Sequence, residues 1–201
     1  MMLNFVTILN LLLRGVINSM EFRKIKIFNG MAFDVPKHIV RIDILGAKTT
    51  HGWQVRYGKP WKFFSDHTAN GTGAELALSK AVNELNHRIA TLPAPTGIRQ
   101  KISTRKSSTL PSGISGPFQR LRKGRSTASH YLQVTLPVHG GKSKNTQVYI
   151  ASDNNFTEER LQLAISKSVA LRNLYIEKYQ TSATKLKREI MQATIDAQPG
   201  V

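Results

Sequence analysis

The sequence predicts an α+β protein made of two repeats of a three-stranded antiparallel sheet packed on one helix, with a basic linker between them. The first observation is an internal repeat: segment 77–89 recurs as 164–176, with Ala, a Ser-Lys pair, Val, Asn and Ile matched at a constant offset. The second is a set of strand-like runs before each copy, and the third is a large excess of positive charge. A period this long implies two copies of a small domain rather than a solenoid.

The charge points to a polyanionic partner. The chain has 201 residues and a net charge of +17, and no acidic residue occurs between Glu84 and Asp153. A merely solvated surface would mix both signs, and a membrane-binding segment would show a long amphipathic helix with bulky apolar residues, which the basic stretch lacks. The composition therefore favours nucleic acid over these two alternatives.

Catalysis finds little support in the residue types present. The chain has no cysteine, which excludes disulfides, thiol catalysis and cysteine-based zinc sites. Its six histidines are scattered without metal-ligand spacing, and no phosphate loop follows Gly71 and Gly73. Asp66 and Asp153 stand at strand-to-helix junctions, where a turn or cap explains them. We expect no catalytic residue, metal or cofactor, and a nuclease is the least favoured alternative.

The first residues do not predict a membrane anchor. Segment 1–19 is apolar but interrupted by Asn4, Asn10, Arg14 and Asn18, so it is too short and broken for a membrane span. It also lacks the basic start and small-residue cleavage site of a signal peptide. We interpret it as a doubtful N-terminal extension or short helix, with Met20 as the alternative start, and expect a cytoplasmic, nucleoid-associated protein.

Turn signals divide the rest of the chain into five segments. Two short strands, Ile25–Phe28 and Ala32–Val35, flank Asn29-Gly30, which favours a hairpin turn. Pro and Gly residues interrupt a Ser/Thr- and Lys/Arg-rich linker that we expect to be mobile in isolation. The predicted segments are a leader hairpin 20–36, a first domain 37–92, a linker 93–111, a second domain 112–180 and a C-terminal helix or tail 181–201.

Alternating polarity predicts three strands in the first domain, followed by a helix whose apolar stripe runs from Ala74 to Ile89. The predicted strands are Val40–Ile44, Trp53–Tyr57 and Trp61–Phe64. In the second strand Trp53 and Tyr57 are expected in the core. The alternation also predicts that the side opposite the core shows Arg41 and Asp43 on the first strand and Gln54 and Arg56 on the second.

The second domain repeats this pattern in a modified form. Leu132–Leu136 matches Trp53–Tyr57 and places Gln133 and Thr135 where the first copy has Gln54 and Arg56. A run over 147–150 follows the loop 139–144. Thr157 before two glutamates is typical of a helix start, and this helix is expected to run past Tyr179. Residues 185–193 could extend it or pack separately.

Each unit resembles the DNA-binding domain of the Apetala/ethylene-response-factor class, in the form found in bacteria, phages and mobile elements. The segments that carry the resemblance are His38–Asp43, Gly52–Arg56 and Lys62–Asp66 in the first copy, and Ser112–Gly116 and Tyr131–Leu136 in the second. The second copy departs from the pattern, because Leu132 replaces the usual Trp and its third strand lacks the aromatic pair. Its contacts could therefore differ, or it could serve partly as a structural partner.

The resemblance implies that the outer face of each sheet enters the DNA major groove while the helix packs behind it. Carried over by position, the base-reading residues are Arg41, Asp43, Gln54 and Arg56 in the first unit and Arg120, Arg122, Gln133 and Thr135 in the second. The third strand leaves two alternatives, since a one-residue slip exchanges its faces. Either Lys62 or Trp61 is exposed, and Tyr149 is exposed in the second copy if Val148 and Ile150 face its core.

Further basic residues are expected to contact phosphate or a minor groove, with a solubilising tether as the alternative for the linker. They are Lys59, Arg99, Lys101, Arg105, Lys106, Lys123, Arg125 and Lys144. The predicted function is sequence-preferring binding of double-stranded DNA by a transcriptional regulator. The alternative is an architectural, recombination or packaging accessory factor of a phage or mobile element. A homodimer or protein partner could form through the C-terminal helix.

Overall fold

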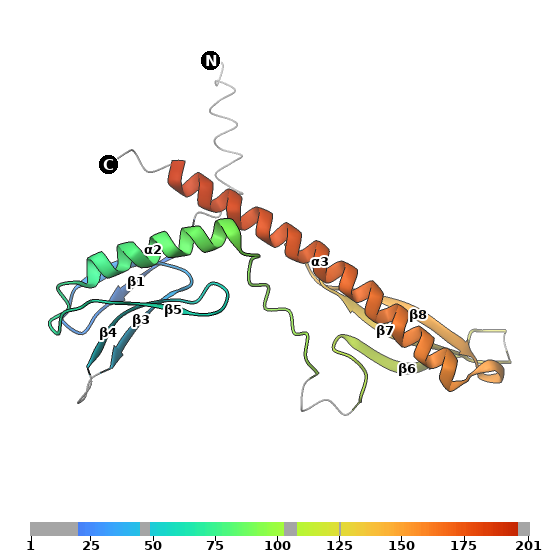
Figure 1. Ribbon diagram of the computed structural model, residues 1–201. Coiled ribbons are helices and arrows are strands. Elements are labelled where there is room, and N and C mark those ends of the chain that lie inside the picture. The colour runs from blue at the N-terminus through green and yellow to red at the C-terminus, as the bar shows by residue number, and fades with distance from the viewer. Residues whose placement is uncertain (1–19, 45–48, 103–107, 125, 197–201) are drawn as a thin grey trace, which may run out of the picture. The chain divides into compact units, whose positions relative to one another are not determined.

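The computed structural model describes residues 20–44, 49–102, 108–124 and 126–196 (Figure 1). Within these ranges the protein is α+β, with three small antiparallel sheets and two α-helices. The chain divides into two compact units. Unit 1 comprises the described parts of Met1–Pro95 and Thr184–Val201, and unit 2 is Thr96–Ala183 with its own gaps.

Unit 1 begins with the predicted hairpin, made of β1 (Phe22–Lys26) and β2 (Ala32–Pro36). Strand β1 ends earlier than expected, because Ile27 already belongs to the turn and donates its amide to the Met31 carbonyl at 2.9 Å. Gly30 supplies the left-handed conformation of this turn, with φ of 91°. Ile27 and Val35 are buried in the same core as the following sheet, so the hairpin packs onto that core.

The main sheet of unit 1 has the order β3-β4-β5, with β3 at Ile39–Ile44, β4 at Thr50–Val55 and β5 at Lys62–Ser65. Helix α2 (Ala74–Thr91) covers one face of this sheet (Figure 1). Alanines at 74, 77 and 81 let the helix approach the strands closely, and Leu85 and Ile89 continue the buried stripe. We call the opposite side of each three-stranded sheet its outer face.

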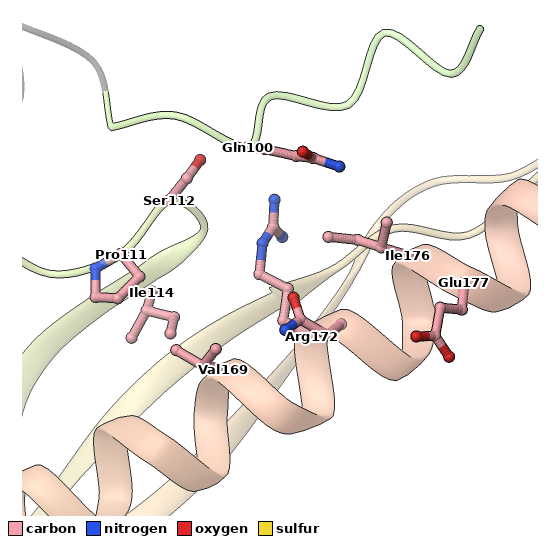
Figure 2. A pocket seen from close by; sticks show the side chains of 9 residues that line it. Gln100, Pro111, Ser112, Ile114, Val169, Arg172, Ile176 and Glu177 are labelled. Carbon is pink, nitrogen blue, oxygen red and sulfur yellow. The ribbon is translucent and has the colours of Figure 1, made fainter.

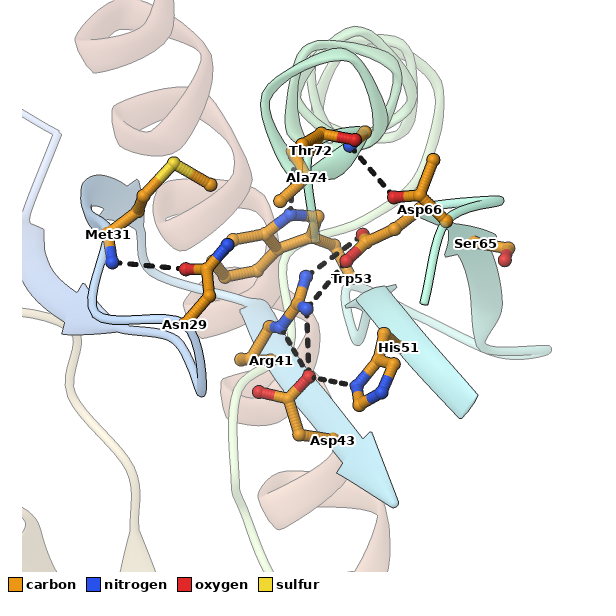
Figure 3. Close-up of polar contacts among 12 residues, drawn as sticks. Asn29, Met31, Arg41, Asp43, His51, Trp53, Ser65, Asp66, Thr72 and Ala74 are labelled. Carbon is orange, nitrogen blue, oxygen red and sulfur yellow. Dashed lines mark hydrogen bonds and ion pairs between the residues drawn. The ribbon is translucent and has the colours of Figure 1, made fainter. Parts of the chain in front are cut away.

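Trp53 is the central side chain of this core. It is fully buried, and its indole Nε1–H donates to the carbonyl of Ala74 at 2.8 Å (Figure 3). The Phe33 ring of the hairpin meets it edge-on at 5.8 Å. Tyr57 is also fully buried, so the prediction that both aromatic residues belong to the core is confirmed.

The prediction that β3 exposes Arg41 and Asp43 is wrong. The strand register pairs Arg41 with Trp53 and Asp43 with His51, which places both charged residues on the core side of the sheet. The Arg41 side chain is only 6% exposed. Its guanidinium lies 4.9 Å from the centre of the Trp53 ring, a cation–π contact that the predicted outward orientation would not allow.

Two carboxylates compensate the buried guanidinium of Arg41 (Figure 3). Its terminal nitrogens donate to the two oxygens of Asp66 at 2.9 and 2.6 Å, and its Nε donates to Asp43 at 2.9 Å. Burial raises the pKa of Asp43, but the hydrogen bonds from Arg41 and His51 outweigh it, so the net pKa is lowered. The ion pairs explain why a charged side chain occupies an inward position.

Unit 2 contains the sheet β6-β7-β8, with β6 at Ile114–Arg120, β7 at Ser129–Leu136 and β8 at Lys144–Ser152. The short 3-10 helix η1 (Asp153–Asn155) follows. The register of β6 shifts between Ser115 and Phe118. The core of this unit is built on β7, whose buried side chains pack with residues of β6, β8 and the following helix; they are Leu132, Val134 and Leu136.

Helix α3 spans Glu158–Asp196. It therefore runs past Tyr179, and residues 185–193 extend it, the first of the two predicted alternatives. Ala164 and Ser168 are buried against the sheet of unit 2. From Thr184 onward the helix belongs to unit 1, where Met191 packs against the core and Arg188 Nε donates to the Ile89 carbonyl at 3.2 Å.

Two hydrogen bonds attach described parts of the linker to the units on either side of it. In unit 1 the Ala94 amide donates to Thr184 Oγ1 at 3.0 Å. In unit 2 the Ser112 hydroxyl donates to the Arg99 carbonyl at 3.0 Å. Residues 103–107 lie outside the described part of the chain.

Replacing Asp66 by Asn should destabilise unit 1 strongly. The change leaves Arg41 buried with an incomplete set of carboxylates, and breaking a buried pair on one side typically costs about 3–5 kcal/mol. Trp53 and Trp61 are the only tryptophans of the chain and both belong to unit 1, so fluorescence during urea unfolding reports on this unit.

The matched control is Glu21→Gln. It breaks the ion pair between Lys37 and Glu21, whose side chains are 58% and 74% exposed, so the expected loss is much smaller than for Asp66→Asn. Equal losses for Asp66→Asn and Glu21→Gln would show that the Arg41 pair adds nothing to stability.

The stability of unit 1 should fall as the pH drops from 6.5 to about 4, because His38 resists protonation in the folded state. Burial, followed by the positive charge of Lys187, lowers the pKa of His38 from 6.5 to about 4. Between these values the unfolded chain binds a proton that the folded chain does not, so the free energy of unfolding decreases with falling pH. Urea unfolding followed by tryptophan fluorescence at a series of pH values measures this.

The variant His38→Asn isolates this contribution. His38 has φ of 76°, a conformation that Asn tolerates, so the substitution should remove part of the pH dependence without straining the backbone. His67→Asn is the control, because His67 also has positive φ but is exposed. A pH profile of His38→Asn identical to that of the unsubstituted protein would contradict the assignment.

Candidate nucleic-acid interface

The alternation of buried and partly exposed side chains along the central strand, β7, shows which residues lie on the outer face of the second sheet. Leu132, Val134 and Leu136 are buried, so the alternate residues of β7 lie on the other side of the sheet. These are Tyr131, Gln133 and Thr135. Helix α3 covers the buried side, and no helix or strand among the described residues of this unit covers the outer face (Figure 1).

Six side chains enclose a hollow of about 340 Å³ on this outer face, and they come from all three strands and the turn after β6. They are Arg120, Arg122, Ser129, Tyr131, Gln147 and Tyr149. The register pairs Tyr131 with Tyr149 and Arg120 with Ser129 across the strands. The arrangement offers two guanidinium groups, an amide and two phenols from one surface, a set suited to hydrogen-bonding an anion or the edges of bases.

The outer face of this sheet carries no carboxylate among its described residues. Asp153 lies beyond the end of β8, and both of its carboxylate oxygens have hydrogen-bond partners there. Its Oδ1 lies 2.6 Å from His130 Nε2 and accepts from Gln119 at 3.0 Å, while Oδ2 accepts from the Ala128 amide at 2.9 Å. The hydrogen bond with His130 is the main reason why the pKa of Asp153 is lowered.

The outer face of the first sheet places Gln54 and Arg56 where the sequence predicts them. Gln54 lies opposite Phe63 in the register of β4 and β5. Arg56 donates from Nε to Gln54 Oε1 at 2.8 Å, and its guanidinium lies 4.8 Å from the centre of the Trp61 ring. The two polar residues and the indole therefore form one connected group.

The third strand of the first sheet places Trp61, and not Lys62, on the outer face. Phe64 packs against the core, so its neighbours in the two-residue period, Lys62 and Asp66, share the inner side. Trp61 and Phe63 are 52% and 38% exposed. Lys62 instead reaches Glu84 of α2, with Nζ to Oε2 at 2.7 Å.

Gly52 determines how Phe63 lies on the outer face. A Cβ atom on Gly52 would overlap both the Phe63 ring and the Phe64 carbonyl oxygen. Because glycine lacks this atom, the ring can rest directly over the backbone of β4. Gly52 is therefore needed both for the position of the Phe63 ring on the outer face and for the close pairing of β4 with β5.

The remaining predicted residues are distributed around the two sheets. Lys59, Lys123 and Lys144 are exposed in turns or at a strand end, and Arg99 and Lys101 are exposed in the linker. Thr135 donates its hydroxyl to Asn145 Oδ1 at 3.0 Å. Three predicted residues, Arg105, Lys106 and Arg125, lie outside the described residues.

The prediction missed several outer-face residues. Tyr131 and Gln147 line the hollow beside Tyr149, and Phe63 and Phe118 are exposed on the first and second sheets. Tyr131 comes directly before the core residue Leu132, and Gln147 comes two residues before Tyr149. Alternation along each strand therefore indicates that both lie on the outer face. Phe118 follows a register shift, which simple alternation does not signal.

A larger hollow of about 420 Å³ lies between α3 and the linker of unit 2 (Figure 2). Arg172 projects into it and donates to two backbone carbonyls, those of Thr135 and Arg99. Burial lowers the pKa of the Arg172 guanidinium. A side chain at Gly113 would overlap this guanidinium. Arg172 therefore holds backbone in place, and we assign it a structural role.

No cluster of three or more potential metal ligands occurs in the part of the chain that the structure describes. None of the helices in that part has an apolar stretch long enough to cross a membrane. Comparisons with protein-family models, with curated proteins and with solved structures find no match.

Proposed function

We propose that the chain is a sequence-preferring double-stranded DNA-binding protein that presents the outer faces of its two three-stranded sheets to major grooves. The observation that carries the proposal is the outer face of unit 2, where Arg120, Arg122 and Tyr149 line a carboxylate-free hollow. The net charge of +17 supports a polyanionic partner. The function that best accounts for these features is transcriptional regulation in the cytoplasm, on the nucleoid.

The chemistry of both outer faces suits base recognition. A narrow β structure can enter the major groove, Arg can pair bidentately with guanine, and Gln can pair with adenine. The first sheet offers Gln54 and Arg56, and the second offers Arg120, Arg122 and Gln133. Since helices occupy the inner faces, the outer faces are the surfaces left for a ligand.

The repeat and its resemblance to the Apetala/ethylene-response-factor class are part of this proposal. In both units the third strand ends at a serine that is followed by an aspartate, and the two aspartates, Asp66 and Asp153, make similar hydrogen bonds. The Asp66 amide donates to the His51 carbonyl at 2.9 Å, and the Asp153 amide donates to the Ala128 carbonyl at 3.0 Å. Each carboxylate also accepts from the first strand of its sheet, from Arg41 of β3 and from Gln119 of β6.

Two small modules on one chain bind more tightly than either alone if the linker can span both sites. Selecting duplexes from a random pool with the full-length protein tests the proposal directly. Enrichment of a defined sequence with a short footprint is expected. Failure to retain any duplex would overturn the proposal, and strong bending with little base preference would favour the architectural alternative.

The variant Arg120→Gln should weaken binding to the selected duplex by about 1–3 kcal/mol and relax the preference at one base position. The measurement is titration of selected and scrambled duplexes with fluorescence anisotropy. Lys167→Gln is the matched control, because it removes the same charge from the exposed side of α3. Equal losses for Arg120→Gln on both duplexes would mean that Arg120 contacts phosphate alone.

Binding should depend steeply on salt. If about six to ten phosphates are neutralised, the affinity falls about 10³–10⁵-fold between roughly 50 and 200 mM salt. Lys59→Gln and Lys101→Gln should each reduce the slope of log affinity against log salt by about one without changing the preferred sequence. An unchanged slope in both variants would exclude these lysines as phosphate contacts.

A further inference from the structure

We propose that the two outer faces recognise different features of DNA: the outer face of unit 1 recognises the 5-methyl groups of thymine, and that of unit 2 recognises hydrogen-bonding edges. The inference rests on the proposed function and extends it to the base composition of each half-site. It follows from a difference in side-chain chemistry between two surfaces that otherwise share strand number and order.

The outer face of unit 1 is largely apolar. Trp61, Phe63 and Ile44 are 52%, 38% and 54% exposed, and Val40 and Ile42 are half-buried on β3. Water-exposed apolar side chains grouped on one surface are typical of a binding site. In the major groove the principal apolar group is the methyl of thymine, which side chains such as Phe contact directly.

The polar groups on this face are placed beside the apolar ones and are already oriented. Gln54 accepts from Arg56 Nε, so its amide retains its N–H donors for a base. Arg56 bonds Gln54 through Nε, which leaves its terminal nitrogens for guanine, and its guanidinium lies over the Trp61 ring. Phe63 lies opposite Gln54 in the strand register. The expected half-site therefore has thymine methyl groups next to a guanine.

Charge favours DNA over a protein as the occupant of this surface. Arg56 and Lys59 stand at the edge of the apolar group, and the described residues of this face include no carboxylate. A second copy of the chain, docked symmetrically, would bring the same cations together across the interface. DNA supplies both the methyl groups and the opposite charge.

The outer face of unit 2 has a different composition. Two tyrosines, two glutamines and a threonine, together with Arg120 and Arg122, provide hydrogen-bonding groups along its strands. Phe118 is the exposed aromatic hydrocarbon of this face, at 42%. We expect this unit to respond to changes in donors and acceptors and to be nearly indifferent to methyl groups.

Replacing thymine by uracil in the selected duplex tests the difference, because it removes the methyl and preserves every donor and acceptor. The half-site of unit 2 is identified as the one where Arg120→Gln relaxes base preference. In the other half-site, each contacted thymine should weaken binding about fourfold when replaced, the factor expected for burial of one methyl-sized group. Replacements in the half-site of unit 2 should leave the affinity unchanged.

Two matched phenylalanine variants test whether the outer face of unit 1 causes the difference between thymine and uracil duplexes. Phe63→Ser should bind thymine and uracil duplexes equally, whereas Phe118→Ser should keep the difference. Tryptophan fluorescence during urea unfolding checks that Phe63→Ser is folded. If it is not, Ile44→Ser, at the exposed end of β3, replaces it and should reduce the difference.

Two results would overturn the inference while leaving the proposed function intact. One is a selected duplex whose binding does not change with uracil at any position. The other is self-association of the free protein that Phe63→Ser abolishes, without a thymine–uracil difference, which would make this face an interface between copies. Absence of any selected duplex would instead overturn the proposed function itself.

Discussion

The covering of one side of each three-stranded sheet by a helix determines which side chains are left for a ligand. In unit 1 the indole of Trp53 fixes this arrangement, because its hydrogen bond to Ala74 joins the central strand to the first turn of α2. In unit 2 the same constraint is met by aliphatic packing of β7 against α3. The two-residue period of the strands then assigns every neighbouring side chain to the core or to the outer face.

Sequence alternation predicted the strands and helices well where the apolar residues define one side clearly. Leu132, Val134 and Leu136 leave no ambiguity, so Gln133 and Thr135 lie on the outer face as predicted. In β3 the same reasoning fails, because it assigns the apolar residues Val40 and Ile42 to the core side, which Arg41 and Asp43 occupy. Alternation within one strand cannot show that a carboxylate far along the chain, at Asp66, compensates a buried Arg41.

The candidate site shows where further limits lie. The choice between Trp61 and Lys62 depended on a one-residue slip that the run of aromatic residues could not decide, and packing of Phe64 on the core decides it. The hollow beside Tyr149 depends on the alignment of three strands, including one whose register shifts after Ser115. Such features arise from pairing between strands and are not visible in any single segment.

Helix α3 contributes to the cores of both units, and this makes unit 1 discontinuous in the sequence. Its compact body needs Met191 and Arg188, which are encoded after the whole of unit 2. A fragment ending at Pro95 would expose part of its apolar interior and lose the partner of the Ile89 carbonyl. The N-terminal half therefore cannot complete its core during synthesis until Met191 has left the ribosome.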